Sequence, residues 1–220
     1  MTNWRDYYND ERLTSRWGYI ASILYHALFL FSIIRRHPKC TLEVGCGRGF
    51  HSIFLSYFVH SVIGIDTNKE VIALARQCNI RFHGKARFQL IDGHRIPFRD
   101  NSFDIVFSQG LLEHFSDKDM TNFVDEWLRL APVCVVSVPS VEYGAREFGN
   151  ERLLTTGEYQ RIFTNYSVNF RSYGFRPVER GLSLSNILQS HKLLNPCSSR
   201  SQILLTIKRH LLRRSDLSLP

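Results

Sequence analysis

Short apolar runs alternate with longer segments of helical periodicity along most of this chain. Each run is rich in valine, isoleucine, leucine or phenylalanine, which is typical of strands. The runs predict strands at 41–44, 61–66, 86–91, 103–108, 133–138, 174–180 and 202–208. Several segments between them repeat their apolar residues every three or four positions and predict helices. Strands that alternate with helices indicate an α/β fold with a mostly parallel sheet.

Capping residues mark where two of these helices begin. Thr67 or Asn68 precedes an alanine-rich helix that is expected to run to Cys78. Ser116, with Asp119 three residues later, precedes a helix with a continuous apolar stripe. That stripe comprises Met120, Phe123, Val124, Trp127, Leu128 and Ala131. A stripe at this spacing predicts a helix that supports the core.

The segment 19–34 is apolar enough to raise the question of a membrane. Its apolar residues fall at positions 20, 23, 24, 27, 28, 31 and 34, which is a helical period. The segment is short for a span, carries His26 and two serines, and follows a charged stretch without a small-residue cleavage site. Neither a spanning helix nor a signal peptide is therefore expected, and a helix packed on the sheet is predicted.

Composition limits the class of protein. A chain of 220 residues with 44% hydrophobic residues is sufficient for the core of one domain. The five cysteines are odd in number and show no C-x-x-C spacing, so neither a disulfide framework nor a metal site is predicted. A reducing, cytoplasmic setting is expected.

The chain carries a formal charge of +8, and the basic excess is concentrated near its end. From residue 181 onward the chain has six basic residues and only one acidic residue. Such a region could bind RNA or a membrane surface. No aromatic residues interleave the basic ones as stacking platforms for bases would, so a solvated loop and tail is favoured and nucleic acid is disfavoured as a partner.

The clearest chemical signal lies between Thr41 and His51. A short strand breaks there into a glycine-rich turn, and a helix with apolar residues at 53, 54, 57 and 58 follows. The glycines are Gly45, Gly47 and Gly49. They permit backbone angles closed to other residues and let a ligand approach the main chain. Because Phe50 and His51 stand where a dinucleotide fingerprint has its third glycine, strict dinucleotide binding is disfavoured.

Glu43, at the end of the first strand, indicates the kind of ligand. A carboxylate there suits a cationic amine better than a pyrophosphate, which it would repel. S-adenosylmethionine carries such an amine, and the segment 42–49 (Leu-Glu-Val-Gly-Cys-Gly-Arg-Gly) resembles the first motif of the class I S-adenosylmethionine-dependent methyltransferases. The resemblance covers residues 38–208. It implies a Rossmann-like, doubly wound sheet of seven strands, mostly parallel with an antiparallel last strand, and helices on both faces.

Two acids follow the glycines in the order expected of this family. Asp66 lies about 20 residues beyond them, the distance at which a βαβ unit brings a carboxylate to ribose hydroxyls. The resemblance implies that Asp92 accepts from the adenine amino group, and that Pro-Phe at 97–98 followed by Ser-Phe-Asp at 102–104 is a second family feature. The predicted cofactor contacts are Glu43, Gly45, Cys46, Gly47, Gly49, Asp66, Thr67, Asp92, Gly93, Gln109 and Gly110.

Candidates for a catalytic base lie after the fourth and fifth strands. The Glu-His pair at 113–114 resembles a pair found in many relatives. His114 ranks first because imidazole titrates near neutral pH, and Tyr143 and Glu142 follow. The alternative for His114 is a structural histidine bonded to nearby backbone.

The chain is predicted to form one domain with four parts. Thr155 and Glu158 form a capping box for a helix expected to run towards Tyr173. Near the start, Tyr7, Tyr8 and Trp17 suit either a cover over the ligand or ordinary packing. The parts are an N-terminal helical cover at 1–37, a cofactor-binding core at 38–140, a lid or substrate insertion at 141–173 and C-terminal strands at 174–208.

The expected reaction is in-line attack by a small-molecule acceptor, through O, N or C, on the sulfonium methyl of S-adenosylmethionine. Positioning supplies much of the acceleration in such a transfer. An RNA or protein methyltransferase, or a non-catalytic member that binds the cofactor or a partner, are the alternatives. The G-x-S-x-G elbow of hydrolases and the G-x-x-x-x-G-K-[ST] loop of phosphate-binding NTPases are absent. No motif specifies the acceptor or the oligomeric state.

Overall fold

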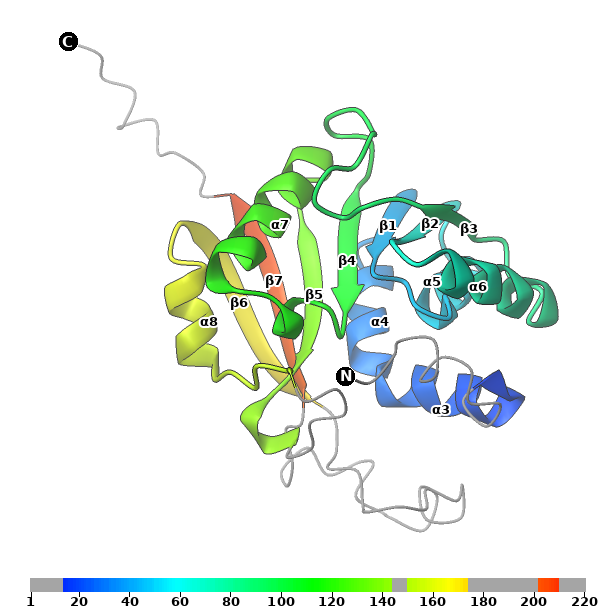
Figure 1. Cartoon of the computed structure of the whole chain (residues 1–220), viewed down its shortest axis with the longest axis horizontal. Coiled ribbons are helices and arrows are strands. Elements are labelled where there is room, and N and C mark those ends of the chain that lie inside the picture. Colours follow the sequence, from blue (N-terminus) through cyan, green and yellow to red (C-terminus); the bar gives the residue numbers. More distant parts are fainter. Residues whose placement is uncertain (1–13, 144–149, 174–201, 210–220) are drawn as a thin grey trace.

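A computed structural model describes residues 14–143, 150–173 and 202–209 and shows a seven-stranded sheet in the order β3-β2-β1-β4-β5-β7-β6 (Figure 1). The strands are β1 (Cys40–Val44), β2 (Ser61–Asp66), β3 (Arg87–Leu90), β4 (Ile105–Gln109), β5 (Cys134–Pro139), β6 (Tyr166–Tyr173) and β7 (Gln202–Arg209). β1 to β5 pair in parallel, whereas β7 runs antiparallel to both β5 and β6. The predicted fold class and the antiparallel last strand are confirmed.

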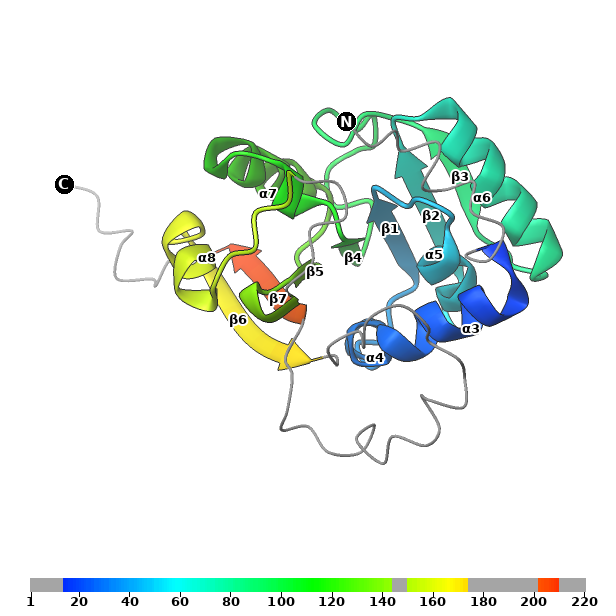
Figure 2. The same ribbon diagram turned by 60° about the horizontal axis from the view of Figure 1, so that its bottom comes forward.

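Helices cover both faces of the sheet. On one face lie α3 to α6, and on the other α7 and α8 (Figure 2). The helices are α3 (Arg16–Tyr25), α4 (Ala27–Ile34), α5 (Phe50–Leu55), α6 (Lys69–Arg81), α7 (Asp117–Leu130) and α8 (Thr156–Ile162), with short 3₁₀ turns η1 (Leu112–His114) and η2 (Val141–Tyr143). Alternate residues of the central strands therefore point into two separate cores.

Strand β4 shows how one strand serves both cores. Ile105 and Phe107 pack with α4 and α5, while Val106 packs with α7. α7 buries the apolar stripe predicted for it, and Trp127 in that stripe is fully buried. The Ser116 side chain accepts from the backbone N–H of Asp119 at 3.2 Å, as the capping signal predicts. The core thus holds the carboxyl ends of β1, β2 and β4 in fixed register.

The helix predicted from Thr155 towards Tyr173 is too long. Its capping box forms, but the helix ends at Ile162 and the strand β6 occupies 166–173. Residues 167, 169 and 171 are exposed, whereas those between them are wholly or partly buried, a period of two that belongs to a strand. The strand predicted at 174–180 and the connection at 181–201 lie outside the described residues.

The single helix predicted over 19–34 is two helices. α3 and α4 meet at His26 with a bend of 70°. α4 buries Phe29, Leu30 and Ile33 rather than the predicted stripe. Among the described residues no single helix is long and apolar enough to cross a membrane. Among these residues only the bent pair α3–α4, with its two helices taken together, has the length and the apolar composition of a span.

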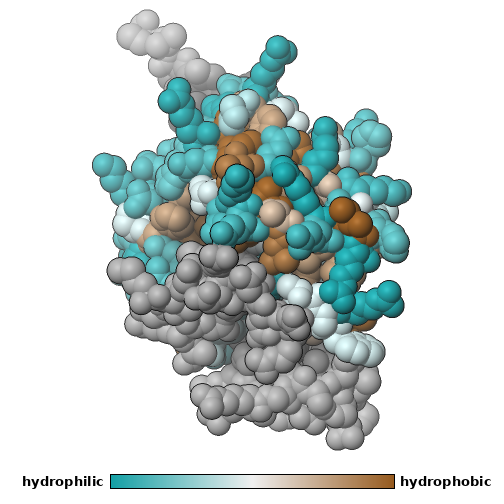
Figure 3. All heavy atoms as spheres, turned by 45° about the vertical axis from the view of Figure 1, so that its right-hand side comes forward, coloured by the Kyte–Doolittle hydropathy of each residue, from teal (hydrophilic) through white to brown (hydrophobic). Residues whose placement is uncertain are grey.

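The helix after the glycine turn is shorter than predicted. α5 ends at Leu55, and Tyr57 and Phe58, expected on its apolar face, are exposed. In α6 the cap is Asn68, whose side chain accepts from the N–H groups of residues 70 and 71. Figure 3 shows hydrophobic surface between polar side chains on the side of the molecule that carries α3, α5 and α6.

Candidate functional site

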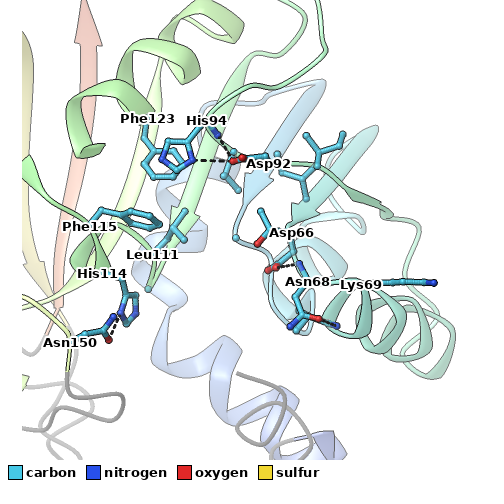
Figure 4. A pocket seen from close by; sticks show the side chains of 18 residues that line it. Asp66, Asn68, Lys69, Asp92, His94, Leu111, His114, Phe115, Phe123 and Asn150 are labelled. Atoms are coloured by element: carbon cyan, nitrogen blue, oxygen red, sulfur yellow. Dashed lines mark hydrogen bonds and ion pairs between the residues drawn. The ribbon is translucent and has the colours of Figure 1, made fainter. Parts of the chain in front are cut away.

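A cavity of about 830 Å³ lies at the carboxyl ends of the parallel strands (Figure 4). Residues of the loops that follow β1, β2, β3 and β4 line it, and Phe123 of α7 and Asn150 complete its wall. β1 stands between β2 and β4, so the direction of winding reverses at this point in the sheet. Crevices at such a switch point are where doubly wound sheets bind their ligands.

The glycine turn after β1 could be built only with glycine at its key positions. Gly45, Gly47 and Gly49 have φ values of 69°, 53° and 75°, a region that side chains disfavour. A Cβ atom on Gly49 would lie 2.4 Å from the ring of Phe88, and one on Gly45 would lie 3.0 Å from the Leu111 side chain. The backbone of this turn therefore packs directly against its neighbours, and Gly45 forms part of the cavity wall.

Asp66 is held at the end of β2 by the turn itself. Its Oδ2 accepts from the N–H of Gly47 at 3.2 Å, and its Oδ1 accepts from the N–H of Asn68 at 3.0 Å. Burial raises the pKa of this carboxyl, although the backbone N–H groups oppose the shift. Each carboxylate oxygen keeps capacity for a further hydrogen bond. Asp66 can therefore accept from the vicinal hydroxyls of a ligand in the cavity.

Asp92 belongs to a turn that also places an aromatic wall. Its Oδ1 accepts from the N–H of His94 at 2.9 Å, and that hydrogen bond lowers the pKa of the Asp92 carboxyl. The His94 ring lies against Phe123 with centroids 3.9 Å apart, and Figure 4 shows both beside Asp92. Gly93 is required here, because a Cβ on it would lie 2.6 Å from Val44.

Glu43 lies behind the turn and is not among the residues that line the cavity. Its side chain is buried, and its Oε2 accepts from the hydroxyl of Ser52 at 2.6 Å and from the Ser52 N–H at 3.1 Å. Its other oxygen lies 3.3 Å from Nδ1 of His51. The carboxylate thus fastens the start of α5 to β1, and its predicted contact with the cofactor's amine stays a prediction.

The predicted cofactor residues divide into two groups. Those that line the cavity are Gly45, Asp66, Thr67, Asp92, Gly93 and Gly110. Those that do not are Glu43, Cys46, Gly47, Gly49 and Gln109. The second group supports the first: Gly47 binds Asp66, and Cys46 is buried with its thiol pKa raised by burial.

Of the three proposed catalytic residues, His114 alone lines this cavity. Its Nδ1 lies 3.0 Å from Oδ1 of Asn150. With an amide oxygen as partner, Nδ1 is the donor and Nε2 is the basic nitrogen of the neutral ring. Glu142 and Tyr143 lie in η2, beyond β5, and do not line the cavity. Tyr7 and Tyr8, which were proposed as part of a cover over the ligand, lie outside the described residues.

Glu113, the first residue of the Glu-His pair, is a buried acid next to His114 but is not part of the cavity lining. Glu113 is 3% exposed, and an Oε1 contact of 3.6 Å to a Cβ built on Gly110 places its carboxyl beneath the loop after β4. Burial, with a smaller contribution from the nearby Glu151, raises the pKa of Glu113 to about 8. Arg152 holds the neighbouring segment in place through the carbonyl of Phe115 and the carboxylate of Asp117.

Sequence reasoning missed most of the apolar wall. Its members come from β1, β2, α6, the segment after β3, the loop after β4 and α7, so no local pattern unites them. They are Val44, Ile65, Val71, Ile91, Leu111, Phe115 and Phe123. A possible signal was their position: most lie within a few residues of a predicted strand end.

Comparison with known proteins identifies the family. Residues 42–132 match the family described as a methyltransferase domain. An uncharacterized methyltransferase, YcgJ of Bacillus subtilis (strain 168), is 34% identical over 77 residues, which is 34% of this chain and 30% of that protein. The segment 42–132 therefore belongs to this family, and the strand order of the sheet agrees with the fold that the resemblance to the class I S-adenosylmethionine-dependent methyltransferases implies. The chloroplastic tocopherol O-methyltransferase of Arabidopsis thaliana is 38% identical over 98 residues, 42% of this chain and 27% of that protein.

The chain spans less than a third of the length of these curated relatives. Solved structures show the same fold over most of its length. The PH0226 protein of Pyrococcus horikoshii OT3 superposes with a TM-score of 0.69 at 15% identity, covering 93% of this chain and 98% of that one. Magnesium protoporphyrin IX methyltransferase of Synechocystis PCC 6803, solved with bound S-adenosylmethionine, gives a TM-score of 0.59 at 14% identity, covering 91% of this chain and 82% of that one.

S-adenosylmethionine is the cofactor of this family, and the residues of the cavity fit it. The cavity volume lies within the range of about 300–1,000 Å³ that is usual for ligand sites. Gly45 leaves its main chain open to a ligand, Asp66 presents acceptors for hydroxyls, and the apolar wall suits a flat base. The acid on the β3 turn, Asp92, can accept from an exocyclic amine.

Proposed function

We propose that this protein transfers a methyl group from S-adenosylmethionine to a small-molecule acceptor. The observation that carries the proposal is the cavity at the switch point, with Asp66 and Asp92 on adjacent strand ends and an apolar wall opposite. When bound, S-adenosylmethionine supplies a methyl group on a positively charged sulfur, which makes that methyl electrophilic. The residues of the chain bind and orient the cofactor and the acceptor, and they exclude water from the site.

Asp66 and Asp92 are the orienting groups of this proposal. Asp66 is fixed by two backbone N–H groups before any ligand arrives, so little rotamer entropy is lost on binding. Asp92 is fixed in the same way by the N–H of His94. Two carboxylates that are held in place at neighbouring strand ends define both the position and the direction of an adenosine-like ligand.

His114 is proposed as the group that takes a proton from the acceptor. It lies in the cavity wall on the opposite side of the strand ends from Asp66, and its Nδ1 contact with Asn150 fixes the ring (Figure 4). In that tautomer Nε2 is the basic nitrogen, and we assign to it the proton of a hydroxyl or amine acceptor. Glu142 and Tyr143 stay as second proposals because they follow β5 at the same edge of the sheet.

The small-molecule class is supported by the relatives that share the matched segment. Those named for a substrate include phosphoethanolamine N-methyltransferases of Arabidopsis thaliana and Triticum aestivum and the tocopherol O-methyltransferase. Their names include both N- and O-methyltransferases. We therefore propose that the part of the pocket that differs between these relatives determines which atom is methylated. An RNA or protein acceptor stays the alternative.

A screen for transfer tests this proposal. The purified chain is incubated with methyl-labelled S-adenosylmethionine and pools from a library of small amines, phenols, hydroxy acids and phospho-compounds, and label is followed into each pool. Transfer to at least one small molecule, abolished by excess S-adenosylhomocysteine, is expected. Label that enters only added RNA or protein would contradict the small-molecule proposal, and cofactor binding without transfer to any acceptor would favour a non-catalytic member.

A further inference from the structure

The helices α3 and α4 carry a stripe of exposed apolar side chains that the core does not use. Their exposed fractions run from 40% to 64%. We call this set the apolar stripe: Trp17, Ile20, Leu24, Leu28 and Phe31. The residues are three or four positions apart throughout, so they lie along one side of each helix. Large apolar groups that gather on one side of each of two consecutive helices mark an interaction surface, unlike single exposed ones.

The fold itself requires only the other side of α4. Phe29, Leu30 and Ile33 are at most 1% exposed and pack in the core beneath the sheet. α4 is therefore hydrophobic on two sides, although one side is sufficient to hold it on the sheet. The second side is a cost in solubility unless something covers it.

A cationic groove begins where the apolar stripe ends. This groove, of about 350 Å³, lies between the end of α4 and the outer strands β6 and β7. Its cations are Arg35, Arg36, Arg171 and Lys208, and no carboxylate is part of its lining. Among the ion pairs of the described residues, none involves these four side chains. Within the part of the chain that the structure describes, no carboxylate therefore compensates the positive charge of the groove.

The arrangement of Arg36 shows that the groove is a formed feature. Its guanidinium donates to the carbonyl of Ser32, and its Nη2 lies 3.4 Å from the hydroxyl of Thr206 on β7. Burial and the neighbouring Arg35 lower the pKa of Arg36, which is the direction expected of cations brought together. A multivalent anion in the groove would relieve that repulsion.

The apolar stripe and the cationic groove are continuous. Arg35 follows Phe31 by four residues and therefore lies on the same side of the chain as the stripe. Figure 2 shows α3 and α4 together along one margin of the molecule, with the end of β6 beside α4. An aromatic and aliphatic strip bordered by lysine and arginine is the pattern of helices that lie in a membrane interface.

We propose that the α3–α4 pair docks this protein on an anionic membrane surface. The apolar stripe enters the interfacial region, and the cationic groove receives phosphate oxygens of lipid headgroups. The pair lies on the membrane rather than across it, because the far side of α4 is buried in the core and the helices bend by 70°. RNA is the weaker occupant, since Ile20, Leu24 and Leu28 gain nothing from a hydrated sugar–phosphate chain. This docking is independent of the proposed reaction.

Flotation with lipid vesicles tests the docking. The full chain is mixed with vesicles of phosphatidylcholine alone, or of phosphatidylcholine with 30% phosphatidylglycerol, and the bound fraction is measured over a range of salt concentrations. Binding is expected with the anionic vesicles and is expected to weaken as salt rises, because screening acts on the headgroup contacts. Absence of binding to anionic vesicles at low salt would overturn the proposal.

Two variants separate the contributions. Leu28→Ser with Phe31→Ser removes the centre of the stripe and is expected to lower the partition constant by tenfold or more. Arg35→Glu, Arg171→Glu and Lys208→Glu together are expected to lower it on the order of a hundredfold, since each cation near an anionic surface contributes about a fivefold factor. The matched control, Lys39→Glu with Lys85→Glu and Lys118→Glu, changes the net charge equally at exposed sites outside the groove.

The control decides whether the site or the net charge acts. Equal loss in the control and in the groove variant would show non-specific attraction and overturn the proposal. Sedimentation velocity of the same proteins tests another occupant: a dimer that the stripe variant abolishes, without vesicle binding by the original chain, would assign the stripe to a second copy. Each variant is first shown to bind S-adenosylhomocysteine as the original chain does, so that loss of docking is not loss of folding.

Discussion

The two sides of the cavity are built in different ways. The β1–β2 side is a local structure, in which the glycine turn and Asp66 bind each other within 19 residues of sequence. The η1 side is assembled from distant segments, with His114 joined to Asn150 and the Glu113 carbonyl accepting from the N–H of Arg152 at 2.8 Å. The first side suits a ligand common to a family, and the second can change with little effect on the first. This division predicts cofactor binding on one side and acceptor choice on the other.

The largest effect is expected on the local side. Gly49→Val adds a branched side chain at a φ of 75°, where its Cβ would lie 2.4 Å from the ring of Phe88. Strain and displacement of the ring are expected to lower the free energy of unfolding by about 2 to 4 kcal/mol and to weaken cofactor binding. Urea unfolding measures the first and calorimetry the second. Gly157→Val, in an open position of α8, is the control and should cost no more than about 1 kcal/mol.

On the assembled side of the cavity, Glu113 is expected to make the free energy of unfolding fall as pH rises. Its pKa is raised from 4.5 to about 8 in the folded protein, so the unfolded chain releases this proton first. Between these pH values the folded state holds more protons, and the free energy of unfolding therefore decreases with pH. Glu113→Gln is expected to remove this slope and to be more stable than the original chain at pH 9, by about 2 to 4 kcal/mol.

The control for Glu113 has a shift of the opposite sign. Glu158 caps α8, and its hydrogen bonds from the N–H and hydroxyl of Thr155 lower the pKa of its carboxyl. The stabilisation that the ionised Glu158 carboxylate gives to the fold is present at neutral pH and is lost as pH falls through that lowered pKa. Glu158→Gln should therefore leave the slope between pH 5 and 8 unchanged. If the free energy of unfolding of Glu113→Gln fell with pH as steeply as that of the original chain, Glu113 would not be a buried, protonated acid.

His114 is expected to affect the rate rather than cofactor binding. With an acceptor found in the screen, His114→Gln should lower kcat about a hundredfold, because the group that takes the proton of the acceptor is lost. His60→Gln, at an exposed position outside the cavity, should leave kcat unchanged. An unchanged kcat in His114→Gln would show that the histidine is structural or that the acceptor reacts without loss of a proton.

The contrast between the two sides also explains what the sequence could predict. The glycine turn, the capped helix α7 and the strands β1 to β5 and β7 rest on local patterns, and the structure has them where the patterns placed them. Asp66 was found because one βαβ unit sets its distance from the glycines. Asn150 and Phe123 carry no such signal, because only tertiary packing brings them into the cavity wall.

The errors have physical causes as well. The helix predicted up to Tyr173 followed from a genuine capping box, which specifies where a helix begins but not where it ends. In 19–34 a helical period was correct, but apolar residues occupy both sides and the stripe chosen was the exposed one.

The central claim is that Asp66 and the glycine turn form a site for S-adenosylmethionine. Calorimetric titration with S-adenosylhomocysteine tests it most directly, with the original chain, Asp66→Asn and the surface control Asp100→Asn compared at equal ionic strength. The original chain and the control should bind alike, and Asp66→Asn should bind about tenfold to a hundredfold more weakly, because a charged acceptor of two hydroxyls is lost. Absence of binding by the original chain at high micromolar ligand, or equal affinity of Asp66→Asn, would contradict it.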